Sequence, residues 1–183
     1  MSSPTADVSV RVAWADDAEA IASLQARAWA TSYAGLVPAA GELAVADFAA
    51  VWRESLGKPG DARNRVLVAL ERNRVVGFAV MAPSSDPDTD PVAVGELMEL
   101  TVGEGERGKG HGSRLLHAAV DTMAADRFAR AVIWLVAGDD ALRGFLSDAG
   151  WGPDTARRTL DLDGTGATQV KQIRMHTGFD AAN

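Results

Sequence analysis

The chain has 183 residues, 47% of them hydrophobic and 23% charged, which is typical of a single globular domain spanning residues 1–183. No apolar run is long enough to span a membrane, and the absence of cysteine excludes disulfides, thiolate zinc sites and thiol nucleophiles. A net charge of −7 without a basic stripe argues against nonspecific nucleic-acid binding. The first ten residues lack the parts of a secretory signal, so we expect a cytoplasmic protein.

Alternating hydrophobic residues predict a first strand over Val8–Trp14. Asp16, with Glu19 three residues later, is typical of a capping box at a helix start. Hydrophobic residues at helical spacing then predict a helix that runs to about Ala30. Glycine and proline in the stretch Thr31–Gly41 predict a loop after it.

A second predicted helix ends at Gly57 and carries four large hydrophobic residues on one face: Val45, Phe48, Trp52 and Leu56. Two strands follow, Val66–Leu70 and Val75–Met81, which are joined by the tight link Glu71–Arg74. The stretch Ala82–Val94 is rich in proline and aspartate and is predicted to be an exposed loop.

The second half of the chain predicts a strand over Glu96–Val102, a helix beginning near Gly110, and a buried strand over Ala131–Ala137. Asp139 can cap a further helix that Gly150 closes. Two more strands are predicted at the end: Arg157–Leu162 and Val170–Thr177. The order β-α-α-β-β-β-α-β-α-β-β, without an internal repeat, predicts a mixed α/β fold.

The segment Val102–Ser113 is glycine-rich and lies between a predicted strand and a predicted helix. Its five glycines let backbone N–H groups approach an anion closely. The positive end of the helix dipole, near Gly110, points at the same place. These features predict binding of a phosphate-bearing ligand.

Two familiar phosphate motifs fit this segment poorly. Gly103, Gly105 and Gly108 have the spacing of the dinucleotide fingerprint, but that motif belongs to an early βαβ unit and about half of the chain precedes it here. Gly103–Lys109 matches a P-loop, yet Gly110 stands where the Ser or Thr that holds Mg²⁺ is required. A P-loop phosphotransferase therefore remains only an alternative.

Arg107–Gly112 fits the pattern R-x-x-G-x-G, which resembles the pyrophosphate-binding signature of the GNAT acetyltransferases. Further stretches are similar to the same family: Trp29–Pro38, Leu100–Val102, Leu115–Leu116, and Phe145 with Ala149–Trp151. The resemblance extends over nearly the whole chain. It implies the GNAT fold, an α/β (α+β) architecture with a mixed, mostly antiparallel central sheet flanked by helices.

The family implies an N-acetyltransferase in which a primary amine, on a small molecule or a protein, attacks acetyl-CoA directly while both are bound. By resemblance, acetyl-CoA is held by the end of the strand and the glycine-rich turn: Leu100, Thr101, Val102, Arg107, Gly108, Lys109, Gly110, His111, Gly112 and Ser113. The N–H of Val102 is a candidate donor to the thioester carbonyl. Many relatives are dimers, so a homodimer stays open as an alternative.

Glu96 stands where some GNAT enzymes carry the general base that takes the proton of the amine. Even spacing predicts that Glu96 shares a face of its strand with Leu100 and Val102. Glu99, on the opposite face, is the second candidate.

Leu146 occupies the position of the tyrosine that protonates the leaving thiolate in many relatives, and leucine has no proton to give. Tyr33, the only tyrosine, lies in the region that lines the amine pocket in relatives and could substitute. The departure at Leu146 also keeps open a different class of function, a coenzyme A-binding module with little or no turnover.

No metal site is predicted from spacing. Asp86, Asp88 and Asp90 lack the glycine and glutamate of a calcium loop and are interpreted as a solvated loop. The three histidines share no metal-ligand spacing: His111, His117 and His176. His111 is expected to face the coenzyme.

Overall fold

The computed structural model describes residues 7–34 and 45–179. Among these residues the strands are β1 (Val8–Val12), β2 (Arg65–Glu71), β3 (Arg74–Pro83), β4 (Val94–Val102), β5 (Arg130–Val136), β6 (Gly152–Asp161) and β7 (Gln169–Gly178). The helices are α1 (Ala18–Ser32), α2 (Val45–Gly57), α3 (His111–Ala125) and α4 (Asp140–Asp148), with short 3₁₀ turns η1 (Ala15–Asp17) and η3 (Glu104–Glu106). The predicted order of helices and strands is confirmed.

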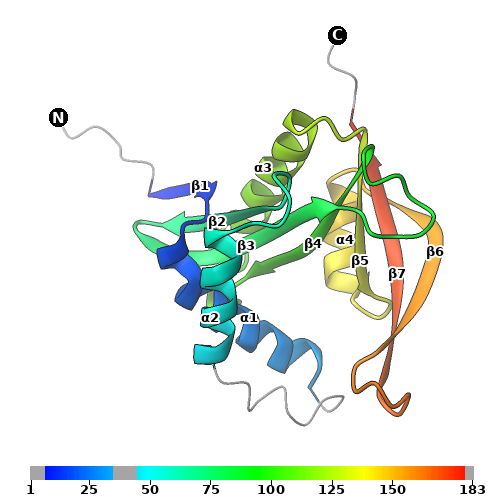
Figure 1. The fold of residues 1–183 in the computed structure, drawn as a ribbon, viewed down its shortest axis with the longest axis horizontal. Coiled ribbons are helices and arrows are strands. Elements are labelled where there is room, and N and C mark those ends of the chain that lie inside the picture. The colour runs from blue at the N-terminus through cyan, green and yellow to red at the C-terminus, as the bar shows by residue number, and fades with distance from the viewer. Residues whose placement is uncertain (1–6, 35–44, 180–183) are drawn as a thin grey trace.

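The strands form one seven-stranded sheet in the order β1-β2-β3-β4-β5-β7-β6. Only β4 and β5 pair in parallel, and the other neighbours are antiparallel. Helices α1 and α2 cover one face of the sheet, and α3 and α4 lie on the other (Figure 1). The mixed, mostly antiparallel sheet between helices is the predicted architecture. No helix among the described residues is long and apolar enough to cross a membrane.

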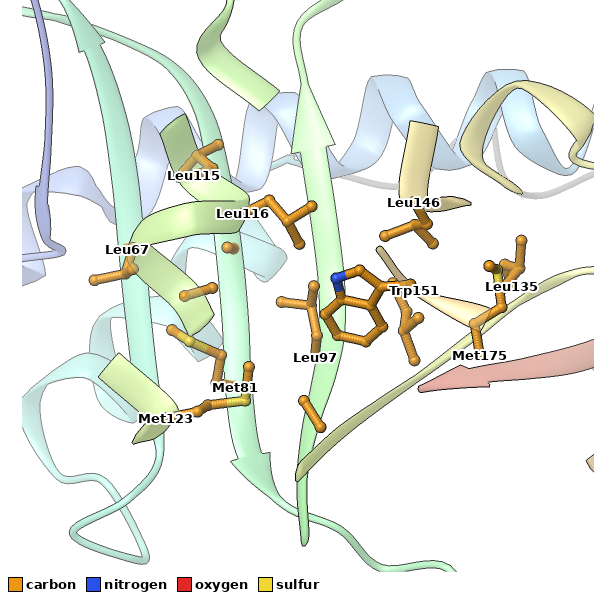
Figure 2. Close-up of a cluster of buried hydrophobic side chains, with 14 of the residues drawn as sticks. Leu67, Met81, Leu97, Leu115, Leu116, Met123, Leu135, Leu146, Trp151 and Met175 are labelled. Atoms are coloured by element: carbon orange, nitrogen blue, oxygen red, sulfur yellow. The ribbon is translucent and has the colours of Figure 1, made fainter. Parts of the chain in front are cut away.

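Each face of the sheet has its own hydrophobic core. Beneath α1 and α2, Ile21 and Leu24 of α1 pack against Phe78 and Val68 of the sheet. The larger core lies beneath α3 and α4, and the buried residues labelled in Figure 2 belong to it: Leu67, Met81, Leu97, Leu115, Leu116, Met123, Leu135, Leu146, Trp151 and Met175. The sheet is therefore packed against helices on both faces.

The beginning of α1 differs from the prediction. Asp17, and not Asp16, supplies the carboxylate, because it accepts the N–H of Trp14 at 2.7 Å and pairs with Arg11 at 2.7 Å. The first strand ends at Val12, and the Trp14 side chain is 62% exposed. The predicted loop after α1 begins later than expected, since Thr31 and Ser32 are helical, and its residues 35–41 lie outside the described residues. That gap also contains much of the motif Trp29–Pro38.

The cap of α4 is confirmed, since the Asp139 side chain accepts the N–H of Leu142 at 2.9 Å. The final strands are longer than predicted, and β6 begins at Gly152 because its pairing with β7 continues across a register shift between Pro153 and Arg157.

The interpretation of this loop as solvated is confirmed for Asp88, whose side chain is 61% exposed, but it is wrong for Asp86, whose side chain is 9% exposed. Arg174 of β7 is only 4% exposed, and its guanidinium binds Asp86 at 3.0 Å, Asp88 at 2.6 Å and Asp154 at 2.7 Å. Asp86 also accepts the indole N–H of Trp134 at 2.8 Å. A buried guanidinium needs this compensation, so the loop after β3 is tied to the far half of the sheet.

Replacing Arg174 by methionine is expected to lower the free energy of unfolding by about 3–5 kcal/mol, because it leaves Asp86 and Asp154 with only their more distant cations, Arg158 at 3.8 Å and Arg130 at 3.7 Å. Urea denaturation monitored by circular dichroism measures this loss. The matched control is Arg157→Met on the exposed side of β6, expected to change stability by less than about 0.5 kcal/mol. Equal stability of the two variants would contradict the role given to Arg174.

Candidate active site

Strands β4 and β5 are paired only over their first residues. The parallel ladder joins Val94 to Arg130 and ends where Glu96 faces Val132. On its other side, β4 stays paired with β3 as far as Val102, which faces Gly77. From Glu96 onward, β4 therefore has one edge without a strand partner.

The alternation of an antiparallel ladder decides which backbone groups point toward this open edge. Gly103 donates its N–H to the carbonyl of Val76 at 2.9 Å, so Gly103 is turned toward β3. In an antiparallel ladder the N–H and C=O of one residue point to the same side of the strand, and those of the next residue point to the other side. The N–H groups of Val102 and Leu100 consequently point into the gap between β4 and β5. Thr101 is turned toward β3, like Gly103.

The glycine-rich loop forms a cradle of backbone N–H groups at the same end of β4. Gly108 and Gly110 have φ of 76° and 85°, in the left-handed region that glycine adopts without strain. Gly110 is the N-cap of α3, and Arg114 is the first residue to donate within the helix, to Gly110 O at 3.1 Å. The N–H groups of the first turn have no acceptor within the helix. The cradle therefore fits a pyrophosphate group.

A cavity of about 470 Å³ opens beside this loop. It is lined by α1, by the beginning of β3, by Thr101 and Val102 at the end of β4, and by the loop as far as Arg107. The volume lies within the range of about 300–1,000 Å³ that is usual for small-molecule sites. Arg107 is exposed at its edge, where a guanidinium can meet an anion.

Three other predicted residues of this segment differ in their surroundings: Lys109, His111 and Ser113. Lys109 is held by Glu106, with Nζ 2.8 Å from its carboxylate. The side chain of His111 is 1% exposed and turned into the molecule, so the expectation that it faces the coenzyme is wrong and only its backbone N–H is placed for a ligand. Ser113 lies exposed in the first turn of α3, and its carbonyl contacts His117 Nδ1 at 2.8 Å.

A β-bulge in β4 changes which glutamates share a face. Opposite β3, Val80 faces Glu99 and Met81 faces Leu97, so Met98 has no partner in the ladder. The extra residue shifts the alternation by one. Leu97 lies in the core beneath α3, whereas Glu99 binds Gln25 of α1 on the other face.

Glu96, adjacent to Leu97, therefore lies on the same face of the sheet as Glu99. The prediction that these two carboxylates point in opposite directions is wrong. Leu100 and Val102 pack against the α3 core instead, on the face away from both glutamates.

Glu99 is held by a chain of hydrogen bonds. Gln25 donates to one of its oxygens at 2.8 Å and Thr101 to the other at 3.2 Å. The indole of Trp52 in turn donates to Gln25 at 2.9 Å. Burial raises the pKa of Glu99, and the two side-chain donors oppose that shift. Both oxygens of this carboxylate are already engaged as acceptors.

Glu96 is 8% exposed, at the point where β4 and β5 part. Burial raises the pKa of its carboxyl, the negative charge of Asp86 raises it further, and Arg158 opposes the shift. Arg158 is stacked on Trp134, with 4.3 Å between its guanidinium carbon and the ring centroid. A carboxylate of raised pKa at the point where the two strands part is suited to accept a proton.

Tyr33 and Leu146 lie on different faces of the sheet. Tyr33 is the C-cap of α1 and is half-buried, and burial followed by the charge of Glu99 raises the pKa of its phenol. Leu146 is fully buried in the core beneath α4, beside Leu135, Trp151 and Met175 (Figure 2). Of the two positions, only Tyr33 therefore offers a phenol on the face of the two glutamates.

A model of the acetyltransferase (GNAT) family matches residues 19–151, which is well over half of the chain. This chain belongs to the GNAT family. Curated proteins give no match to its sequence.

Solved structures share the fold of this GNAT protein at low sequence identity. Ribosomal-protein-alanine N-acetyltransferase from Brucella melitensis is 20% identical, with a TM-score of 0.73 over 93% of this chain and 99% of its own. A putative acetyltransferase from Salmonella typhimurium, solved with its cofactor acetyl-CoA, is 18% identical, with a TM-score of 0.71 over 96% of both chains. A GCN5-related N-acetyltransferase from Kribbella flavida is 20% identical, with a TM-score of 0.68 over 97% and 100%.

The sequence pointed to the two glutamates, the glycine-rich cradle and Tyr33 as site residues of this GNAT protein, but it gave no role to Gln25 and Trp52, which the structure joins to Glu99 by hydrogen bonds. Gln25 is 74 residues from Glu99 and stands in a helix where a polar residue looks ordinary. The one local signal was a glutamine among the hydrophobic positions of α1, where a buried amide needs partners.

Gly77 sets how closely β3 approaches the end of β4. A Cβ on Gly77 would lie 2.7 Å from the carbonyl oxygen of Thr101 and 3.1 Å from Leu115. Gly77→Ala is therefore expected to lower the free energy of unfolding by about 1–3 kcal/mol, as measured by urea denaturation. Gly105→Ala is the matched control, since nothing lies within 4 Å of its added carbon. A Gly77→Ala protein as stable as its control would show that β3 and β4 can accommodate a Cβ at this position.

Proposed function

We propose that this protein is an acetyl-CoA-dependent N-acetyltransferase, a single catalytic domain that transfers an acetyl group to a primary amine by direct attack in a ternary complex. The observation that carries the proposal is the glycine cradle at the N-terminus of α3, placed beside the open edge of β4. Membership of the GNAT family and a structural neighbour solved with acetyl-CoA support it.

Acetyl-CoA would supply an acetyl thioester, and the chain's task is to hold and orient it. The backbone N–H groups of Gly108, Gly110 and Gly112 would hold the pyrophosphate, with charge added by Arg107. The edge of β4 that carries the N–H groups of Leu100 and Val102 would pair with the pantetheine arm as an added strand does. The Val102 N–H is the proposed donor to the thioester carbonyl, because a fixed donor stabilises the negative charge that develops there.

A base is needed because an alkyl amine with a pKa of ~10.4 is protonated at neutral pH and cannot attack. Glu96 takes this role in our proposal, since its raised pKa brings it nearer to neutrality and the backbone of Ser85, rather than any side chain, donates to it among the described residues. Glu99 is the second candidate, but Gln25 and Thr101 already donate to both of its oxygens.

Tyr33 is the proposed source of the proton for the departing thiolate. Burial and the nearby charge of Glu99 raise the pKa of its phenol, so it stays protonated at neutral pH. Since a thiol of pKa ~8.5 is a tolerable leaving group, this acid adds to the rate without being indispensable. In this proposal Tyr33 protonates the thiolate from the opposite face of the sheet, because Leu146 has no proton to give.

The second candidate function is coenzyme A binding with little turnover. The observation in its favour is that Leu146 is enclosed in the core, so no phenol lies at the position that relatives use. The two functions share the coenzyme site and differ only in acetyl transfer.

The coenzyme site is tested by Arg107→Ala. Loss of a charge-assisted contact of about 1.5–3 kcal/mol should weaken acetyl-CoA binding by about 10- to 100-fold, as measured by calorimetry. Arg143→Ala, on the exposed side of α4, is the matched control and should bind acetyl-CoA like the unmodified protein. Identical affinity of the two variants would remove Arg107 from the site.

Catalysis is tested by Glu96→Gln, with free thiol release measured against a panel of amines. The unmodified enzyme should show a rate that rises with pH through the raised pKa of Glu96, and the variant should lose this limb and about 10²–10⁴-fold in turnover. The affinity for acetyl-CoA should stay the same. A panel that yields no thiol release with the unmodified protein, despite tight acetyl-CoA binding, would favour the binding module.

Glu96→Gln should also stabilise the fold. Since the pKa of Glu96 is raised on folding, its contribution to stability falls as pH rises through that pKa. At neutral pH the buried charge is therefore destabilising, and its removal should raise the melting temperature. A variant that is both less stable and less active would instead indicate a purely structural role.

A further inference from the structure

Three potential metal ligands meet behind the glycine-rich loop. Glu71 ends β2, Glu106 lies in η3, and His111 is the first residue of α3. One ligand atom from each lies within 4.8 Å of the others. Because the three residues come from different elements, spacing along the chain gave no sign of this cluster.

The imidazole of His111 is the unusual member. Its Nε2 is buried, and among the described residues it has no hydrogen-bond partner. Glu71 Oε2 lies 3.8 Å from it, too far for a hydrogen bond. An unpaired nitrogen in the protein interior is costly, which singles this atom out as one that lacks a partner.

We propose that Glu71, Glu106 and His111 bind one divalent transition-metal ion of the Zn²⁺ type. One imidazole nitrogen and two carboxylate oxygens are ligands that Zn²⁺ accepts, whereas Mg²⁺ and Ca²⁺ prefer oxygen alone. Ligands at about 2.0–2.1 Å in a tetrahedral arrangement are about 3.3–3.4 Å apart. Binding would draw the two glutamate side chains inward from the present spread of up to 4.8 Å, and water would complete the coordination.

Two cations presently neutralise the carboxylates. Arg74 lies 2.6 Å from Glu106, and Lys109 lies 2.8 Å from Glu106 and 3.8 Å from Glu71. The side chains of Arg74 and Lys109 are 63% and 48% exposed, whereas that of Glu106 is 14% exposed, so water reaches each pair from the side of the cation and weakens it. Neither side chain donates to His111 Nε2. A dication can therefore displace both while also satisfying the buried nitrogen.

Such a metal would act on the coenzyme loop. It would fix Glu106 and His111, the residues on either side of the segment 107–110, and tie them to the β2–β3 hairpin through Glu71. It would also release Lys109 from Glu106 toward solvent and any bound phosphate. Because coupling between two sites is reciprocal, acetyl-CoA should in turn tighten metal binding.

The test uses the full chain without an affinity tag, freed of metal by a chelator, with acetyl-CoA absent. Calorimetric titration with ZnCl₂ should give one site, and CoCl₂ should give the visible absorption of a tetrahedral complex. Glu71→Gln and Glu106→Gln should each weaken Zn²⁺ binding by about 10-fold or more. His117→Asn and His176→Asn are the matched controls and should bind like the unmodified chain. Lys109→Met removes a competing cation and should tighten binding.

The two glutamate variants are chosen because they should fold normally. Both glutamates are at least partly accessible, so their amides should leave the circular dichroism spectrum unchanged, whereas replacing buried His111 risks the fold itself. Absence of saturable binding at millimolar metal would overturn the proposal. The proposal would also be overturned if His117→Asn or His176→Asn lowered the Zn²⁺ affinity while Glu71→Gln and Glu106→Gln left it unchanged. The measurement involves neither acetyl-CoA nor an amine, so its result is independent of the proposed transferase activity.

Discussion

The whole site depends on one feature of the sheet, the separation of β4 from β5 after Glu96. Up to that residue β4 is paired on both sides, and beyond it only β3 remains as a partner. The N–H groups of Leu100 and Val102 then point into an opening where no strand can satisfy them. Since unpaired backbone groups must find water or a ligand, the fold itself creates a binding edge. The cradle at the start of α3 lies at the far end of that edge.

The second constraint is the burial of two carboxylates on the face of the sheet that α1 covers. Glu96 and Glu99 are placed on the same face there by the bulge at Met98, and neither forms a salt bridge among the described residues, although Arg158 and Arg174 act on Glu96 from a distance. Burial raises the pKa of both carboxyl groups, but the two oxygens of Glu99 accept hydrogen bonds from Gln25 and Thr101, whereas no side chain among the described residues donates to Glu96. One bulge thus produces two neighbouring carboxylates with different properties, the kind of difference that proton-transfer chemistry uses.

What the sequence could predict was local. The order of elements, the cap at Asp139 and the glycine-rich turn follow from periodicity and residue type within a few positions. The bulge at Met98 could not be predicted, because it depends on how β4 registers against β3. The pairing of Arg174 with Asp86 joins residues 88 positions apart. The composition of the aspartate-rich loop does not reveal whether a distant arginine binds it. The burial of His111 was hidden for the same reason.

The most direct measurement is residue-resolved amide hydrogen exchange with and without acetyl-CoA. If the open edge of β4 pairs with the pantetheine arm, the amides of Leu100 and Val102 should become strongly protected when acetyl-CoA is added. Thr101 and Gly103, which are turned toward β3, should change little. This alternation is the result that the account predicts. Equal protection of all four amides, or none at Leu100 and Val102 under saturating acetyl-CoA, would contradict it.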